Sequence, residues 1–202
     1  MTRTKYLGFV ITTKGIEIDP EKSEPLRNWQ FSTTVREVRG FLGFTGFYRK
    51  FIPDYGVLAR PLHHLTKDNT PFRFDKECQE AFCRIRDAIL SPQVLRHWQP
   101  GLPTQIETDA SDGVVCGILS QKYPDGNWYP IAFYSKTMDS AQCNYAIHDK
   151  ELLAIVRCFE EWRAELIGCE LIEVFLDHKA LEYFITIKHL TSRQVNWAEL
   201  LS

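Results

Sequence analysis

The sequence of 202 residues lacks an apolar run of about 18 residues, the length that a helix needs to cross a bilayer. Its first residues are too polar and too interrupted to resemble a secretion signal. The six cysteines form neither a CxxC pair nor a CxxH companion, so neither a zinc site nor a disulfide framework is indicated. We therefore expect an intracellular protein that is not secreted, does not enter a membrane and keeps its cysteines reduced.

Apolar residues make up 44% of the chain and charged residues 25%, which excludes a disordered chain and allows one or two hydrophobic cores. The net charge of -2 is unevenly distributed. Residues 1–70 contain 11 Lys and Arg against 7 Asp and Glu, a net charge of +4, and the remainder carries 13 against 19, or -6. Such a division fits one part that contacts a polyanion and another that holds cations, although proteins that do neither also show it.

The most informative stretch is TQIETDASDGVVCGILSQ, residues 104–121. A β-rich segment leads to Asp109, residues 109–113 have turn chemistry, and a second β-rich segment starts at Val114, so the pattern predicts a strand, a tight turn and a strand. Asp109 would then lie at the rim of a sheet, next to the turn. An Asx turn made by Asp109 or Asp112 is the common explanation of such a pair. A metal-binding carboxylate is the alternative, and it requires partners elsewhere in the chain.

The chain begins with a predicted hairpin over residues 5–18, whose turn lies around Thr12 to Gly15. Asp19 and Pro20 suit the entry of a helix, the first as the cap and the second in the first turn. Pro25 should kink or shorten this helix.

Two further short helices are predicted before residue 70. Thr34 and Glu37 suit a capping box at the start of one, and the other spans roughly residues 55–65. The functional interpretation of this basic, aromatic region is a nucleic-acid clamp. Its predicted phosphate contacts are Arg36, Arg39, Arg49 and Lys50. From spacing alone, a solvated helix face over an aromatic core is the more frequent explanation.

Asp75 is a candidate cap for another amphipathic helix, which should end at Ser91 and Pro92. The segment that continues to residue 103 contains two further prolines and a glycine. This composition predicts a linker and the boundary between domains.

Beyond the central stretch, a third strand is predicted over roughly residues 128–135, followed by the longest helix of the chain, over about residues 145–167. Glu151 lies close to the start of this helix and near its buried face. Residues 171–176 predict a fourth strand, and Asp177 stands at its carboxyl end.

Three carboxylates would therefore meet if the long helix packed on the sheet: Asp109, Glu151 and Asp177. They would repel one another unless cations held them. Two Mg²⁺ ions bridged by such carboxylates can activate water and stabilise the leaving oxygen in phosphodiester cleavage. The predicted cofactor is Mg²⁺, with Mn²⁺ as its substitute.

Several segments resemble, in order, the polymerase polyprotein of gypsy-type LTR retrotransposons. LGFVITTKGIEIDPEK resembles the end of the reverse-transcriptase palm. TVREVRGFLGFTGFYRKFIPDYGVLARPLHHLTK resembles the thumb helices, and PFRFDKECQEAF resembles the connecting segment. Three further segments resemble parts of the ribonuclease H module: ETDASDGVVCGILSQ, NYAIHDKELLAIV and FLDHKALEYF. The resemblance covers essentially the whole chain.

This resemblance implies an α/β (α+β) fold, in which a small thumb-like helical bundle precedes a ribonuclease H-like mixed sheet with packed helices. The implied parts are the end of a palm-like hairpin at 1–18, the bundle at 19–70, a connecting helix and linker at 71–103 and a truncated ribonuclease H-like domain at 104–202. It also implies that Asp109, Glu151 and Asp177 are three of the four acidic metal ligands of a ribonuclease H.

The sequence departs from the family's pattern in three places, one of which is Pro25, in a helix that family members usually keep regular. It has no aromatic-x-Asp-Asp turn, so DNA synthesis by this chain alone is not expected. The family's carboxyl-terminal strand and helix, which carry the fourth acidic ligand, are missing after Ser202, and their lack should weaken one metal site and expose a sheet edge. We expect a fragment or a decayed open reading frame.

The activity implied by the resemblance is Mg²⁺-dependent hydrolysis of the RNA strand of an RNA/DNA hybrid. The implied partners are nucleic acid and the remainder of the polyprotein, in a cytoplasmic particle or the nucleus. A module that binds nucleic acid or protein without catalysis, and a relic without function, are the alternatives. The sequence leaves the oligomeric state open.

Overall fold

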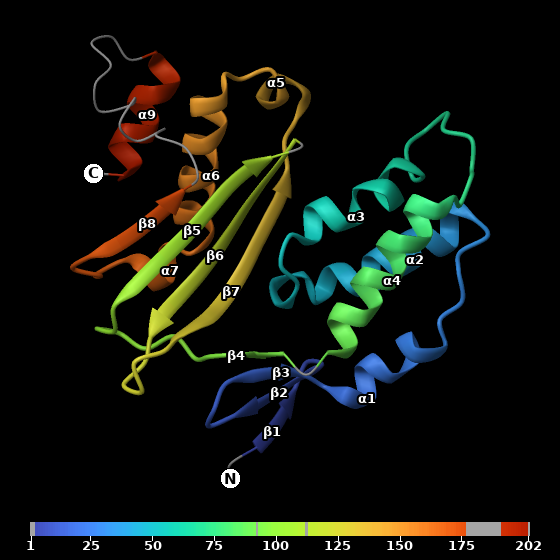
Figure 1. The fold of residues 1–202 in the computed structure, drawn as a ribbon, viewed down its shortest axis with the longest axis horizontal. Coiled ribbons are helices and arrows are strands. Elements are labelled where there is room, and N and C mark those ends of the chain that lie inside the picture. Colours follow the sequence, from blue (N-terminus) through green and yellow to red (C-terminus); the bar gives the residue numbers. More distant parts are fainter. Residues whose placement is uncertain (1–2, 92, 112, 177–190, 202) are drawn as a thin grey trace. The chain divides into compact units, whose positions relative to one another are not determined.

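The computed structural model describes residues 3–91, 93–111, 113–176 and 191–201. The chain divides into two compact units, one of residues 1–97 with 131–133 and one of residues 98–130 with 134–202. Helices and sheets occur in both units (Figure 1), which confirms the predicted mixed α/β class. The division into four parts remains a prediction.

The first unit combines a small sheet with helices. Its elements are β1 (Arg3–Tyr6), β2 (Phe9–Thr12), β3 (Ile16–Ile18), α1 (Pro20–Ser23), the 3₁₀ helix η1 (Glu24–Asn28), α2 (Val35–Phe47), the 3₁₀ helix η2 (Arg49–Phe51), α3 (Tyr55–His64), α4 (Lys76–Leu90) and β4 (Val94–Leu95). Its core is aromatic and aliphatic, and the rings of Phe41 and Phe82 stack with their centroids 4.1 Å apart.

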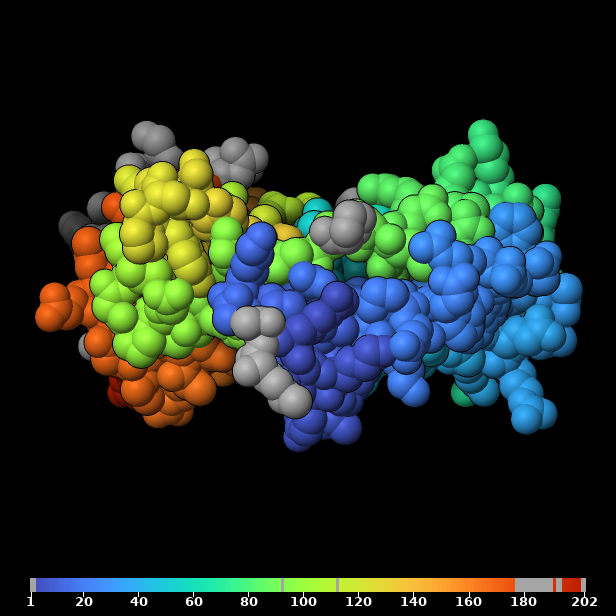
Figure 2. Space-filling view, turned by 90° about the horizontal axis from the view of Figure 1, so that it is seen from below, coloured from blue at the N-terminus to red at the C-terminus, as the bar shows by residue number. Residues whose placement is uncertain are grey.

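The amino-terminal strands form more than the predicted hairpin. The predicted turn between Thr12 and Gly15 joins β2 to β3, but a second turn at Leu7 and Gly8, both with positive φ, separates β1 from β2. Gly8 was the sequence signal for this turn, because glycine adopts positive φ without strain. The residues of β1 are exposed, and Figure 2 shows the amino-terminal strands at the surface.

The segment predicted as a linker contains a strand. β4 pairs with β3 through Ile16 and Leu95 and so completes an antiparallel sheet in the order β1-β2-β3-β4. Two residues of β pattern between a serine and a proline-rich stretch are too short to predict a strand. The pairing depends on a partner almost eighty residues away in the chain.

The helix entries of the first unit follow the sequence closely. The Asp19 carboxylate accepts a hydrogen bond from the Glu21 amide at 3.1 Å, and the chain after α1 tightens into η1, which contains Pro25. The Thr34 hydroxyl caps α2 by accepting from the Glu37 amide at 3.2 Å. The Glu37 carboxylate, however, accepts from the amide of Thr33 at 2.7 Å, so the predicted return bond to Thr34 is replaced by one to its neighbour.

The second unit is a mixed sheet with helices packed on it. Its elements are β5 (Thr104–Ser111), β6 (Val114–Lys122), β7 (Trp128–Thr137), α5 (Ser140–Cys143), α6 (Ile147–Glu161), α7 (Arg163–Leu166), β8 (Ile172–Leu176) and α9 (Ser192–Leu201). The strand order is β7-β6-β5-β8, with β5 antiparallel to β6 and parallel to β8. Among the described residues, no helix combines the length and the apolar character that crossing a membrane requires.

The predicted long helix is divided once. It was predicted to begin at about residue 145, and α6 begins at Ile147, after the separate turn α5 that Asp139 and Gln142 start with a capping box. Trp162 leaves the helical region with φ of -102° and ψ of 23°, and α7 follows. The apolar periodicity continues through this break, which is why the sequence suggested one helix over 145–167.

Candidate functional site

Asp109 was predicted to lie next to a turn. In the structure it lies inside β5. The ladder between β5 and β6 continues two residues beyond it, to the pair of Ser111 and Val114. Asp109 is exposed, and the Ser111 hydroxyl donates a hydrogen bond of 2.7 Å to its Oδ2 atom. The carboxylate therefore stands on the open face of the strand, with a neighbouring hydroxyl that orients it.

The position of α6 on the sheet is fixed by Gly117. This glycine is directly opposite Thr108, and a Cβ atom added to it would collide with Cys158 Sγ and lie 3.2 Å from the Trp162 ring. The helix therefore covers the face that carries Thr108 and Gly117. Since side chains alternate along a strand, Asp109 points to the opposite face.

Glu151 is held in the second turn of α6 and is only 2% exposed. It precedes Cys158 by seven residues, which places it about 10 Å nearer the start of the helix. The start of α6 lies at the same end of the sheet as the carboxyl end of β5 (Figure 1). Glu151 therefore lies toward the same end of the sheet as Asp109, but it belongs to the helix that covers one face, whereas Asp109 points to the other face.

Asp177 lies outside the described residues. The residue before it, Leu176, is the last of β8 and pairs with Thr108, the residue before Asp109. The structure thus brings together the ends of the two strands that the sequence singled out. No group of three metal-ligating side chains occurs within the described part of the chain, which contains two of the three predicted ligands.

The described donors suit a hard divalent cation. Asp109 and Glu151 offer carboxylate oxygens, the ligands that Mg²⁺ prefers. The carboxyl group of Glu151 lies where the protein leaves almost no access to bulk water. Burial penalises an ionised carboxylate unless a cation or donors compensate, so the chemistry of Glu151 fits a cation at this end of the sheet.

Two residues near this end of the sheet were not singled out from the sequence. Asp149, in the first turn of α6, is 7% exposed and accepts a hydrogen bond of 3.0 Å from Gln194 of α9. Gln194 is 5% exposed. Thr191 and Gln194 have the spacing of a capping box, which was the available sequence signal for their role.

The four predicted phosphate contacts all lie exposed in or just after α2. Two of them have intramolecular partners. The Arg39 guanidinium donates to the Thr66 carbonyl at 3.0 Å, and the Lys50 ammonium lies 4.7 Å from the centre of the Phe9 ring. Arg36 projects from the exposed side of α2, and Arg49 follows the helix.

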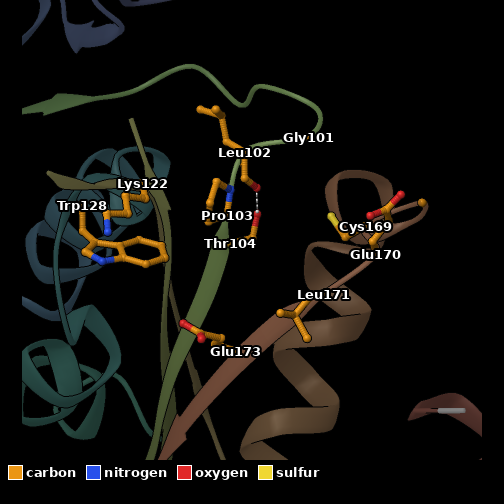
Figure 3. A pocket seen from close by; sticks show the side chains of 11 residues that line it. Gly101, Leu102, Pro103, Thr104, Lys122, Trp128, Cys169, Glu170, Leu171 and Glu173 are labelled. Atoms are coloured by element: carbon orange, nitrogen blue, oxygen red, sulfur yellow. Dashed lines mark hydrogen bonds between the residues drawn. The ribbon is translucent and has the colours of Figure 1, made fainter. Parts of the chain in front are cut away.

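A cavity of about 490 Å³ lies in the second unit, and Figure 3 shows the side chains that line it. It is lined at the amino end of β5 by Thr104 and by Lys122, Trp128 and Glu173 of neighbouring strands. Asp109 is five residues further along the same strand. The cavity therefore does not contain the predicted metal ligands.

Comparison with known families gives a match over residues 74–174 to the RNase H-like domain found in reverse transcriptase. Curated relatives include the Transposon Tf2-3, Tf2-4 and Tf2-5 polyproteins of Schizosaccharomyces pombe, each 35% identical over 181 residues. These alignments cover 89% of this chain and 14% of each relative. The chain thus spans about one seventh of the length of the relatives it matches.

Solved structures with a similar fold include a foamy viral protease-reverse transcriptase in complex with double-stranded DNA. Its TM-score is 0.79 at 21% identity, covering 98% of this chain and 36% of that one. The foamy viral enzyme in complex with an RNA/DNA hybrid gives a TM-score of 0.77 at 22% identity, covering 100% of this chain and 28% of that one. At these identities the likeness concerns the fold.

Proposed function

Because the chain belongs to the family of RNase H-like domains found in reverse transcriptases, we propose that it hydrolyses the RNA strand of RNA/DNA hybrids as part of a retrotransposon polyprotein. One observation carries this proposal. β5 and β8 are parallel and paired as far as Thr108 and Leu176, and an aspartate follows each of these residues in the sequence. Glu151 is buried in α6, whose first turns lie at the same end of the sheet as the carboxyl end of β5 (Figure 1).

The residues that would hold Mg²⁺ are Asp109, Glu151 and Asp177. When bound, the metal supplies the Lewis acidity that activates water and stabilises the leaving oxygen of a phosphodiester. The contribution of the chain is orientation and charge. The Ser111 hydroxyl holds Oδ2 of Asp109 at 2.7 Å, and burial keeps Glu151 at one position in a water-poor environment.

The substrate would be held through its phosphates by exposed basic residues of the first unit. Arg36 and Arg49 are the strongest candidates, and Arg39 and Lys50 would join them at the expense of their contacts within the chain. Because the alignments cover only 14% of each curated relative, we include the remainder of such a polyprotein among the proposed partners. The proposed location is a cytoplasmic particle or the nucleus.

The test is cleavage of an RNA/DNA hybrid with Mg²⁺ by the native chain and by Asp109→Asn. This substitution keeps the size of the side chain and removes its charge, so we expect the rate to fall on the order of 100-fold or more. Glu107→Gln is the matched control, since Glu107 is exposed on the same strand two residues away. Equal rates for the native chain and Asp109→Asn would refute cleavage through this carboxylate.

Binding without cleavage is a second candidate function. It is favoured by the exposure of Arg36 and Arg49, which belong to the first unit, whereas the carboxylates belong to the second. This alternative predicts hybrid binding that weakens with salt and is insensitive to Asp109→Asn, together with no Mg²⁺-dependent cleavage.

A further inference from the structure

We propose that Gln194 and Asp149 are positioning residues for the metal site: their buried hydrogen bond docks α9 on the first turn of α6 and thereby orients Glu151. This inference rests on the proposed function, because it concerns the same carboxylate. It adds a pair of residues that would control metal affinity without contacting the metal.

The contact joins two helices that are distant in the sequence. Gln194 Nε2 donates to Asp149 Oδ1 at 3.0 Å, across 45 residues, and both residues are buried, with exposed fractions of 5% and 7%. A hydrogen bond to a charged acceptor is stronger than one between neutral groups, and breaking it would leave a buried carboxylate without this donor. The contact is therefore costly to lose.

The orientation of the Gln194 amide is determined from its other end. Its Oε1 atom accepts hydrogen bonds from the Thr191 amide at 2.9 Å and from the Thr191 hydroxyl at 3.0 Å. Because Oε1 faces two donors, the Nε2 group must face Asp149. The capping box that starts α9 therefore also presents a donor to α6.

The first turn of α6 depends on this contact because its local cap is weak. Ala146 occupies the capping position, and its methyl group cannot accept a hydrogen bond from the first amides of the helix. Stabilisation comes instead from α9, through the contact of Gln194 with Asp149 and the neighbouring rings of Tyr145 and Trp197, whose centroids are 6.4 Å apart.

Glu151 follows Asp149 by two residues on the same helix. Adjacent turns of a helix move together, since each amide is bonded to a carbonyl four residues earlier. A displacement or fraying of the first turn would therefore shift the Glu151 carboxylate. Substitution of a residue that orients a metal ligand without contacting the metal typically changes metal affinity or activity 10–100-fold.

The decisive variant is Gln194→Glu. A glutamate can still accept the hydrogen bonds from Thr191, but it presents a carboxylate to Asp149. The double variant Asp149→Asn/Gln194→Glu restores a donor and an acceptor with the native net charge and the two groups exchanged. We expect the affinity for Mn²⁺, measured by electron paramagnetic resonance without substrate, to fall roughly tenfold in Gln194→Glu and to recover in the double variant.

Gln142→Glu is the matched control, because Gln142 holds the same position of the capping box that starts α5. It should leave the affinity for Mn²⁺ unchanged. Gln194→Met, which removes both polar atoms and adds no charge, should weaken Mn²⁺ binding without rescue by Asp149→Asn. This variant also decides the question if Gln194→Glu fails to fold.

Native Mn²⁺ affinity in folded Gln194→Glu, or in Gln194→Met, would overturn the inference, and so would a double variant that fails to recover. A lower melting temperature with native Mn²⁺ affinity would mean a purely structural contact and would also overturn it.

Asp109→Asn and Glu151→Gln separate the two proposals. If neither alters Mn²⁺ binding or cleavage, the proposed function fails, whereas if both do and Gln194→Glu does not, only the positioning role fails.

Discussion

Gly117 is the residue on which the packing of α6 against the sheet most directly depends. Gly117→Ala would place a methyl group against Cys158 Sγ and the Trp162 ring. Overpacking of this kind typically costs about 1–3 kcal/mol, so we expect the urea midpoint of unfolding to fall accordingly. Cys158→Ala on the same chain should recover part of the loss, because it removes the atom that the methyl group meets.

A double-mutant cycle is the check on this explanation. The destabilisation of the double variant should be smaller than the sum of the two single effects, since the variants share one contact. Additive losses would show that Gly117→Ala acts through the strand itself and not through the helix.

For several individual residues, the local sequence was sufficient to predict their role in the fold. The caps at Asp19, Thr34 and Asp75 were predicted correctly because capping depends on residues within one turn. Asp109 was correctly placed on a strand of the sheet, but its position next to a turn was wrong. Ser111 has turn chemistry, and pairing with Val114 overrides it.

The residues that the sequence could not supply act through distant partners. Gly117 accommodates Cys158, and Gln194 donates to Asp149. Neither relationship leaves a local pattern, because each joins segments that only the fold brings together. The convergence of the three carboxylates and their shared occupation by a metal remain predictions.

At the scale of the element, α2 contains glycines that its packing does not require. No atom lies within 4 Å of a Cβ added at Gly40 or Gly43. Alanine in a helix interior is more favourable than glycine by about 0.8–1.0 kcal/mol. Gly40→Ala should therefore raise the free energy of unfolding by up to this amount, measured by urea denaturation.

Gly15→Ala is the contrasting variant. Gly15 has a φ of +152°, and an added Cβ would collide with the Leu95 carbonyl of β4. It should lower stability. If Gly40→Ala and Gly15→Ala changed the free energy of unfolding in the same direction, this explanation by helix propensity and steric space would be wrong.

The start of α2 gives a prediction about pH. The hydrogen bond from the Thr33 amide lowers the pKa of Glu37 below its ordinary value. A carboxyl with a lowered pKa in the folded state stabilises the protein above its ordinary pKa, and this contribution is lost as pH falls through the folded value. Glu37→Gln should therefore be less stable than the native chain at pH 7, and the difference should shrink at pH 3.

Thr34→Ala is the control for this effect. It removes the hydroxyl that caps the Glu37 amide, so it should cost about 1 kcal/mol, the typical value for losing a cap. Because the Thr34 hydroxyl also lowers the pKa of Glu37, to a smaller extent than Thr33 does, the loss in Thr34→Ala should depend on pH less strongly than the loss in Glu37→Gln. A pH-independent deficit in Glu37→Gln would contradict the role assigned to the carboxylate.

At the scale of the whole molecule, the order of elements was predictable and their long-range pairing was not. The alternation of strand and helix after residue 104 follows from local periodicity, and the resemblance implied a mixed sheet. The division of the predicted long helix at Trp162 and the pairing of β4 with β3 were missed. Both depend on tertiary packing, which outweighs local propensity in short elements.

The uneven charge of the molecule leads to the last prediction, which concerns hybrid binding. Residues 1–70 have a net charge of +4 in a chain of net charge -2, so overall charge does not favour a polyanion and binding must depend on local basic residues. The logarithm of the binding constant should fall linearly with the logarithm of salt concentration. Arg36→Gln should weaken binding and reduce this slope by about one unit, because one phosphate contact releases about one counterion.

Arg86→Gln separates a local contact from a general charge effect. Arg86 belongs to the same unit and its Nε atom lies 3.0 Å from the Asp87 carboxylate, so the substitution removes the same charge outside the predicted interface. Fluorescence anisotropy with a labelled hybrid at several salt concentrations would measure both slopes. A local contact predicts a native slope for Arg86→Gln and a reduced one for Arg36→Gln, whereas equal reductions would mean that the hybrid responds to total charge and that the exposed side of α2 is not its binding surface.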